Sequence, residues 1–101
     1  MSKAERDLRD FEEIFWGLAH ATRRHVLVVL NSRGGRMLAG DIAKRFSCSW
    51  PTTTRHLKVL EQAGLVSVQK EGRENYYILN HSRLNKIQDW LNWLKEDESD
   101  V

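Results

Sequence analysis

Residues 41–66 read DIAKRFSCSWPTTTRHLKVLEQAGLV, which is the pattern of two short helices joined by a tight turn. Apolar residues recur at helical spacing on either side of the small polar run Ser47-Cys48-Ser49. Ser49 is a favourable N-cap for the second helix, and Pro51 falls in its first turn, where the missing N–H costs nothing. Gly64 follows as a glycine that ends a helix. The stretch therefore predicts a helix-turn-helix whose second helix covers residues 50–63.

The outer face of that second helix offers hydrogen-bonding and cationic side chains. Such helices fill the major groove in many DNA-binding proteins, and an arginine can donate two hydrogen bonds to guanine O6 and N7. We expect DNA contacts from Trp50, Thr52, Thr53, Arg55, His56 and Lys58. A solvated charged face is the alternative for the set. His56 can also be an imidazole packed between this helix and the following hairpin, and Trp50 can pack on the preceding helix.

The residues after this helix predict a β-hairpin, or wing. Residues 65–69 and 75–79 alternate and are rich in β-branched and aromatic side chains, and a turn around Gly72 separates them. Lys70 and Arg73 flank that glycine. Two cations on a small turn suit a contact with the minor groove or with phosphates, and an ordinary solvated hairpin is the alternative.

Helical periodicity places the first helix of the helix-turn-helix pair at residues 37–46 and predicts three more helices, over residues 4–18, 22–31 and 83–95, with Ser82 as the expected cap of the last. The sequence thus predicts a mainly α fold with a small β-hairpin: four helices, two strands and a fifth helix in one winged helix-turn-helix domain over residues 1–101. Arg23 and Arg24 begin the second helix. We expect them to be solvated or to pair with the acidic first helix.

Composition limits the class of protein. A chain of 101 residues with 41% hydrophobic residues is expected to form one packed domain. No apolar run approaches the ~18 residues of a membrane span, and the charged N-terminus lacks the apolar core of a signal peptide. Cys48 is the only cysteine, which excludes an internal disulfide and fits a reducing cytoplasm.

Charge is distributed unevenly along the chain. Residues 1–15 have a net charge of −2 and residues 95–101 of −3, so the total of +2 leaves +7 for residues 16–94. A basic body with acidic ends suits a polyanionic partner such as double-stranded DNA. A soluble surface of mixed charge explains the same numbers.

The terminal helices carry more apolar surface than one small core is expected to bury. An exposed apolar stripe on a soluble protein usually marks an interface. We expect a symmetric homodimer through helices at about 4–18 and 83–95, with interface residues Phe11, Phe15, Trp16, Trp90, Trp93 and Leu94. Two recognition helices related by a two-fold axis would then bind an inverted repeat, with half-site centres about 10 bp or slightly more apart.

Neither metal binding nor catalysis is predicted from the chain itself. Four histidines and one cysteine are scattered without ligand spacing. No glycine-rich phosphate loop and no nucleophile–base motif is present, so no cofactor and no enzymatic activity are expected. A histidine site formed across a dimer stays open, as does a redox role for Cys48 with a thiol of another subunit.

The chain resembles the ArsR/SmtB-type winged-helix repressors of bacteria and archaea over roughly residues 14–94. The resemblance is carried by Leu18-Ala19 before Thr22-Arg23-Arg24, by Arg55-His56-Leu57-Lys58-Val59-Leu60, by Ala63-Gly64-Leu65-Val66, and by Glu71-Gly72-Arg73 before Tyr76-Tyr77 and Leu79. It implies a homodimeric transcriptional repressor, often autoregulatory, that binds operator DNA and in many cases releases it on an effector signal.

The chain departs from the family pattern at three places. His20-Ala21 replaces a frequent Asp-Pro before the second helix. Ser47-Cys48-Ser49 lacks the second thiol of the arsenic-sensing members. The last helix has Asn85, Gln88, Asp89 and Asn92 where zinc-sensing members place their ligands, and His81 is its only nearby imidazole. The family's metal chemistry is therefore not expected, and the effector is unknown. A protein-interaction module without DNA binding and a metal-gated or redox-gated sensor are the alternative functions.

Overall fold

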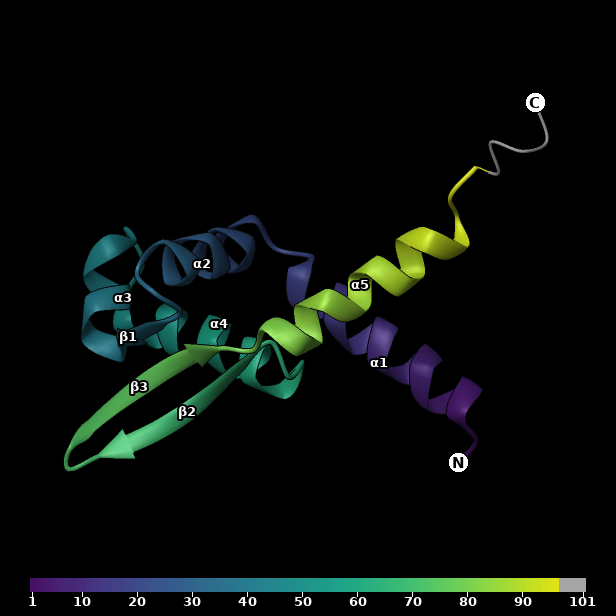
Figure 1. The fold of residues 1–101 in the computed structure, drawn as a ribbon. Helices are drawn as coiled ribbons and strands as arrows, with labels where there is room; N and C mark the ends of the chain where they lie inside the picture. Colours follow the sequence, from purple (N-terminus) through teal and green to yellow (C-terminus); the bar gives the residue numbers. More distant parts are fainter. Residues whose placement is uncertain (97–101) are drawn as a thin grey trace.

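A computed structural model describes residues 1–96 and shows the predicted mainly α, winged helix-turn-helix fold (Figure 1). Of the acidic C-terminal residues noted above, those from 97 onward lie outside the described part. The elements are α1 (Lys3–Leu18), α2 (Ala21–Ser32), β1 (Arg36–Leu38), α3 (Ala39–Arg45), α4 (Trp50–Gln62), β2 (Val66–Glu71), β3 (Glu74–Leu79) and α5 (His81–Trp93). Within residues 1–96, no helix is both long enough and apolar enough to cross a membrane.

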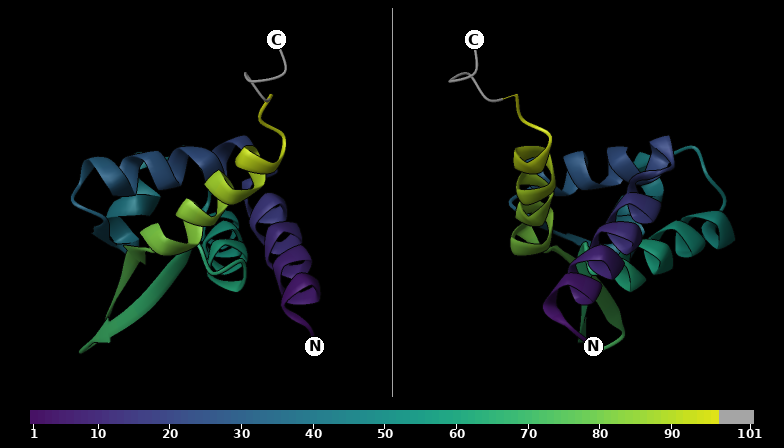
Figure 2. Two further views of the ribbon diagram at one scale, coloured as in Figure 1. Left: turned by 45° about the vertical axis from the view of Figure 1, so that its right-hand side comes forward. Right: turned by 90° about the vertical axis from the view of Figure 1, so that its right-hand side faces the viewer.

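The wing and the terminal helices lie at opposite ends of an elongated molecule measuring 54 × 32 × 22 Å. The hairpin of β2 and β3 projects from the body, with α3 beside its base (Figure 1). At the other end α1 and α5 lie side by side, as all three views show (Figures 1 and 2). The recognition helix α4 lies between the wing and the terminal helices, whereas α3 lies at the same end as the wing (Figure 1).

A short strand was missed in the sequence. Met37 and Leu38 were expected to begin a helix, but Arg36–Leu38 form β1, and α3 begins at Ala39. The strand pairs antiparallel with β3, Arg36 opposite Ile78 and Leu38 opposite Tyr76, which gives a sheet of order β1-β3-β2. The free edge of β3 offers backbone hydrogen bonds to residues 36–38, and this pairing overrides the helical periodicity.

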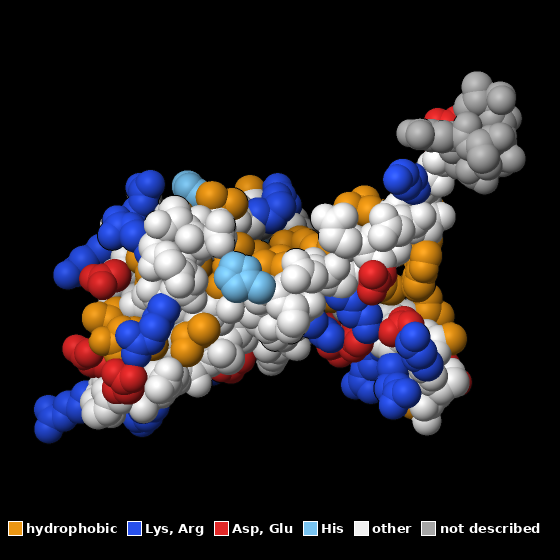
Figure 3. Space-filling view, in the orientation of Figure 1, with side chains coloured by type: hydrophobic (Ala, Val, Ile, Leu, Met, Phe, Trp, Pro, Cys, Tyr) orange, Lys and Arg blue, Asp and Glu red, His pale blue; other side chains and the backbone are white. Residues whose placement is uncertain are grey.

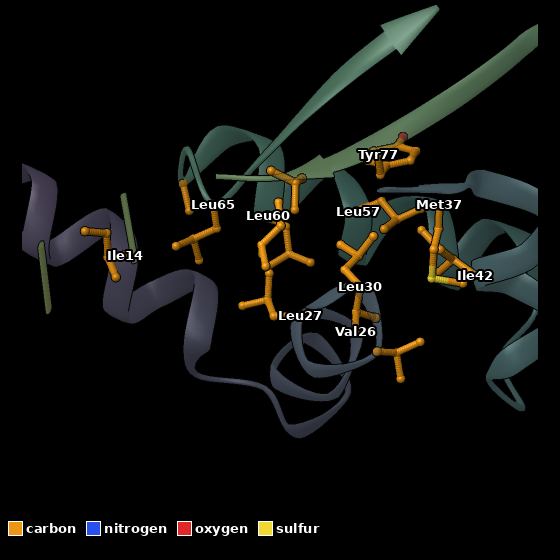
Figure 4. Close-up of a cluster of buried hydrophobic side chains, with 14 residues drawn as sticks. Ile14, Val26, Leu27, Leu30, Met37, Ile42, Leu57, Leu60, Leu65 and Tyr77 are labelled. Carbon is orange, nitrogen blue, oxygen red and sulfur yellow. The ribbon is translucent and has the colours of Figure 1, made fainter. Parts of the chain in front are cut away.

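The core draws buried side chains from every helix except α5 and from all three strands. Six of its largest members are almost inaccessible to solvent, and Figure 4 shows them converging between α1, α2, α4 and the sheet: Ile14, Leu30, Ile42, Leu57, Leu60 and Leu65. Burial of each such side chain stabilises the fold by about 1.5–3 kcal/mol. This core fixes which face of α4 turns inward.

The caps of α4 form as predicted, whereas the cap of α5 differs. Ser49 Oγ accepts a hydrogen bond from the Thr52 N–H, and Gly64 has a φ of 75° directly after the helix. For α5, Asn80 is the N-cap: its Oδ1 accepts from the Arg83 N–H at 3.2 Å, and Ser82 only donates to that oxygen. The expectation for Ser82 is wrong because β3 runs directly into the helix and leaves Asn80 as the last extended residue.

The terminal helices cover part of each other's apolar surface. The rings of Phe11 and Trp93 meet edge-on with centroids 5.2 Å apart, and those of Phe15 and Trp90 with centroids 4.8 Å apart. Phe11 is therefore 5% exposed within a single chain. Because α5 already covers Phe11 within one chain, little of this side chain is left for the predicted dimer interface.

Ion pairs reinforce the same contact between α1 and α5. Lys86 Nζ lies 2.6 Å from Asp10 and 2.9 Å from Asp7, and Arg83 pairs with Asp10 and Glu13 at 3.1 and 3.0 Å. The hydrogen bond from Lys86, together with Arg83, holds the pKa of Asp10 below its usual 3.8. Five charged groups, two basic and three acidic, thus hold the two terminal helices together through four ion pairs.

Candidate nucleic-acid interface

The recognition helix α4 is placed by the core so that its polar side faces solvent. Leu57 and Leu60 point inward and are at most 1% exposed, whereas Arg55 and Lys58 are exposed. Neither cation forms an ion pair with another residue of the described chain, which leaves both charges available to a partner. Three positions apart on a helix, they project over neighbouring parts of one face.

Thr53 does not lie on this outer face. Its side chain is 4% exposed, and its hydroxyl donates to the Ser49 carbonyl oxygen at 3.0 Å. Residue 53 is one turn before Leu57, so it shares the inward stripe of the helix. This burial leaves little of the Thr53 side chain for the predicted DNA contact. Thr52 remains half-buried at the helix start, where its hydroxyl accepts a hydrogen bond from Ser49 Oγ at 3.0 Å.

His56 is half-buried against the start of α2 and does not pack between helix and wing. Its ring centroid lies 4.4 Å from that of His20, and its Nδ1 lies 3.4 Å from Arg23 Nη1. Burial lowers the pKa of His56 below its usual 6.5, and the charges of His20, Arg23 and Arg55 lower it further. The imidazole is therefore neutral at pH 7.

Arg23 is buried, contrary to the expectation of a solvated or ion-paired residue. It is 8% exposed, and its guanidinium donates to the Gly17 carbonyl at 2.8 Å and to the Trp16 carbonyl at 2.9 Å. These carbonyls belong to the last turn of α1, which lacks its ordinary i+4 donors; the Trp16 carbonyl also accepts from the Ala19 N–H at 3.2 Å. Sequence reasoning missed this role, because the arginine and its acceptors belong to different helices.

Trp50 stands at the entrance of α4 and is 55% exposed. It borders a surface hollow of about 340 Å³ between the start of α3 and the beginning of β3 next to the wing turn. The lining includes Lys44 on one side and Arg73 and Asn75 on the other. The indole thus lies where the helix-turn-helix and the wing approach each other, instead of being covered by α3.

The wing carries its cations near its tip. Lys70 and Arg73 are exposed on either side of Gly72, whose φ of 62° allows the tight turn. Arg36 of β1 braces the hairpin, since it pairs with Glu71 at 2.8 Å and its guanidinium stacks 3.5 Å above the Tyr76 ring. Figure 3 shows Lys and Arg side chains, with acidic ones among them, over α3 and the wing.

Comparison with known proteins identifies the family. A family model described as a helix-turn-helix domain matches residues 18–69. The transcriptional repressor SdpR of Bacillus subtilis (strain 168) is 37% identical over 87% of this chain and 97% of that protein. A crystal structure of an ArsR family transcriptional regulator has a TM-score of 0.77 and 26% identity, over 88% of this chain and 95% of that one. The chain belongs to the ArsR/SmtB family of transcriptional repressors.

A more distant ArsR/SmtB-type structure shares the fold. It is the homodimeric winged helix-turn-helix DNA-binding domain of a possible ArsR-family regulator from Mycobacterium bovis, with a TM-score of 0.73 and 20% identity over 98% of this chain and 92% of that one. Within residues 1–96 of the present ArsR/SmtB chain, no three His, Cys, Asp or Glu side chains gather to hold a metal ion. Cys48 is a free, half-buried thiol.

Proposed function

We propose that this ArsR/SmtB chain acts as a homodimer that binds an inverted-repeat operator and blocks transcription, without catalysing a reaction, in the cytoplasm. The observation that carries the proposal is the outer face of α4. Arg55 and Lys58 are exposed there on a helix whose other side is locked into the core. A rigid helix with outward cations is suited to enter a major groove.

Each side chain has a distinct proposed contact with DNA. Arg55 reads a base edge, and Thr52 and Lys58 contact neighbouring bases or phosphates. Trp50, exposed at the helix entrance, packs against the sugar–phosphate backbone. Lys70 and Arg73 hold the flanking backbone from the wing. His56 is directed toward Arg23, so we assign it no direct contact.

The dimer is proposed to form through the remaining apolar surface of α1 and α5. Trp16, Trp93 and Leu94 are 53%, 62% and 66% exposed, and Leu8 and Leu91 add to this apolar surface at 66% and 47%. Phe15 and Trp90 are half-buried beneath it. Burial of such a surface in a second copy removes it from water, and the M. bovis structure is described as homodimeric.

The test is binding of the purified protein to the DNA upstream of its own gene, against a scrambled duplex, over a series of salt concentrations. Sequence-selective binding that weakens steeply with salt supports an autoregulatory repressor. Equal, weak binding to both duplexes contradicts autoregulation. No binding even at low salt would contradict the DNA-binding proposal and favour a protein-interaction module.

A further inference from the structure

Arg23 joins the end of α1 to the middle of the recognition helix. Its Nε and Nη2 donate to carbonyls of Gly17 and Trp16, and its Nη1 lies 3.4 Å from Nδ1 of His56 on α4. The guanidinium also lies over the Trp16 ring, 5.6 Å from its centroid. One buried side chain of α2 thus contacts both a proposed dimer helix and the recognition helix.

The protonation state of His56 follows from its partner. A guanidinium has only donors, so the His56 Nδ1 that faces Arg23 must accept, and the imidazole proton then sits on Nε2. His20 is held in the same way, because its Nδ1 accepts a hydrogen bond from the Thr22 N–H at 3.1 Å. Both rings therefore use Nδ1 as an acceptor, and for His56 protonation of that nitrogen would remove the hydrogen bond from Arg23.

The surroundings of His56 offer no compensation for a positive charge. The groups facing it are His20 and Arg23 from the start of α2 and Arg55 from its own helix. Within residues 1–96, no carboxylate pairs with this histidine. Protonation would turn the acceptor into a donor directed at a guanidinium, so the contact between Arg23 and His56 would break.

We propose that Arg23 and His56 are positioning residues that hold α4 at a fixed angle to α1, and that operator binding is lost when His56 takes up a proton. The inference rests on the function proposed above, because two recognition helices fit one operator only at a fixed separation. Because the pKa of His56 is lowered in the folded protein, operator binding is expected to weaken as the pH falls. The link is intact above the usual value near 6.5 and fails as the pH falls through the lower pKa of the folded protein.

Acidification has the opposite effect on ordinary contacts with DNA. Added positive charge strengthens attraction to phosphates. A histidine that touched phosphate would therefore bind DNA more tightly when protonated. If affinity falls on acidification and the fall depends on His56, then His56 positions the recognition helix and does not contact a phosphate.

The experiment compares operator affinity from about pH 8 to about pH 5.5, with the upstream duplex as probe, for the wild type, His56→Asn and His81→Asn. The Asn oxygen sits near the Nδ1 position and accepts from Arg23 without titrating. The wild type is expected to lose up to about tenfold in affinity per pH unit for each linked proton, and so up to about a hundredfold for the two His56 residues of a dimer. His56→Asn is expected to bind like the wild type at neutral pH and to lose this dependence. His81, an exposed residue of α5, is the control and should keep it.

Three results would overturn the inference: an unchanged pH profile in His56→Asn, a gain of affinity on acidification that His56→Asn abolishes, or dependence on His81. Arg23→Lys tests the same link, since a single ammonium cannot bridge these acceptors. Arg23→Lys should lower operator affinity without changing the slope of log K against log salt. A shallower slope would show that Arg23 contacts a phosphate instead.

NMR titration of the free wild type tests the link without DNA. The inference requires an unprotonated Nδ1 at neutral pH and a pKa below 6.5 for His56. A proton on Nδ1 would refute it. Because this measurement needs neither an operator nor a variant, failure of the DNA-binding proposal stays distinguishable from failure of the link.

Discussion

Gly17 of α1 lies directly against Ala63, which ends the recognition helix. A Cβ atom on residue 17 would be 2.9 Å from the Ala63 Cβ and 2.9 Å from Leu65 Cδ1, closer than side chains tolerate. The absence of a side chain at Gly17 therefore lets α1 and α4 approach. Together with the bond between Arg23 and His56, this contact fixes the recognition helix to the helix proposed to form the dimer.

Substitution of Gly17 by alanine tests this contact. Overpacking is expected to lower the free energy of unfolding by about 1–3 kcal/mol, despite the gain of up to about 1 kcal/mol that alanine brings to a helix. Urea unfolding measures the difference. Gly40→Ala in α3 is the matched control, because nothing lies within 4 Å of its added Cβ, and it should be neutral or stabilising. Equal stability of both variants would show that α1 and α4 do not depend on the close approach.

Removal of the Arg55 side chain is expected to weaken operator binding by about 1–3 kcal/mol and to relax the preference for one base pair. The reason is the loss of a two-pronged contact with a base edge. Competition binding at fixed salt measures the affinity. Arg6→Ala, an exposed arginine of α1, serves as control. An operator affinity that Arg55→Ala leaves unchanged would exclude this residue as a contact.

Arg73→Ala in the wing should act differently. A backbone contact carries no sequence information, so affinity is expected to fall for operator and scrambled duplexes alike. The slope of log K against log salt should become shallower by about 1. Binding isotherms over a salt series provide both quantities. A loss confined to the operator, with an unchanged slope, would assign a base-reading role to the wing.

The dimer surface is tested by Leu94→Glu. Leu94 is 66% exposed after α5, and a carboxylate there would be buried without a partner in the proposed dimer. Sedimentation should show a shift from dimer toward monomer, with weaker operator binding. Val28→Glu, a similarly exposed change on α2 (65%), should leave the dimer intact. A stable Leu94→Glu dimer would place the interface elsewhere.

Acid stability reports on the ion pairs between α1 and α5. Lys86 and Arg83 depress the pKa of Asp10, so the carboxylate stabilises the fold above 3.8 and loses this effect as the pH falls through its lower folded value. Asp10→Asn should lower the free energy of unfolding at neutral pH by about 1 kcal/mol. On acidification below pH 3.8, the variant should lose less of its free energy of unfolding than the wild type does. Thermal unfolding over pH measures this. Glu12→Gln, an exposed neighbour, should follow the wild-type profile.

Much of the fold could be predicted from neighbouring residues alone. Ser49, Pro51 and Gly64 mark the two ends of α4 through hydrogen bonds and backbone angles that span only a few residues. The hairpin around Gly72 is equally local. Helical and strand periodicity predicted the exposed candidates Arg55, Lys58, Lys70 and Arg73. Periodicity distinguishes the outer face of an element from its inner face only to within about one position.

The sequence by itself determined the helix-turn-helix and the wing, and its motifs indicated the family, because caps, periodicity and turns act within one or two helical turns. Only the tertiary structure decided that Arg36–Leu38 form a strand, since β3 pairs with them from 40 residues further along the chain. It likewise buried Arg23 and turned His56 toward it. Those positions depend on where the last carbonyls of α1 lie relative to α2 and α4, and this arrangement exists only once the three helices have packed together.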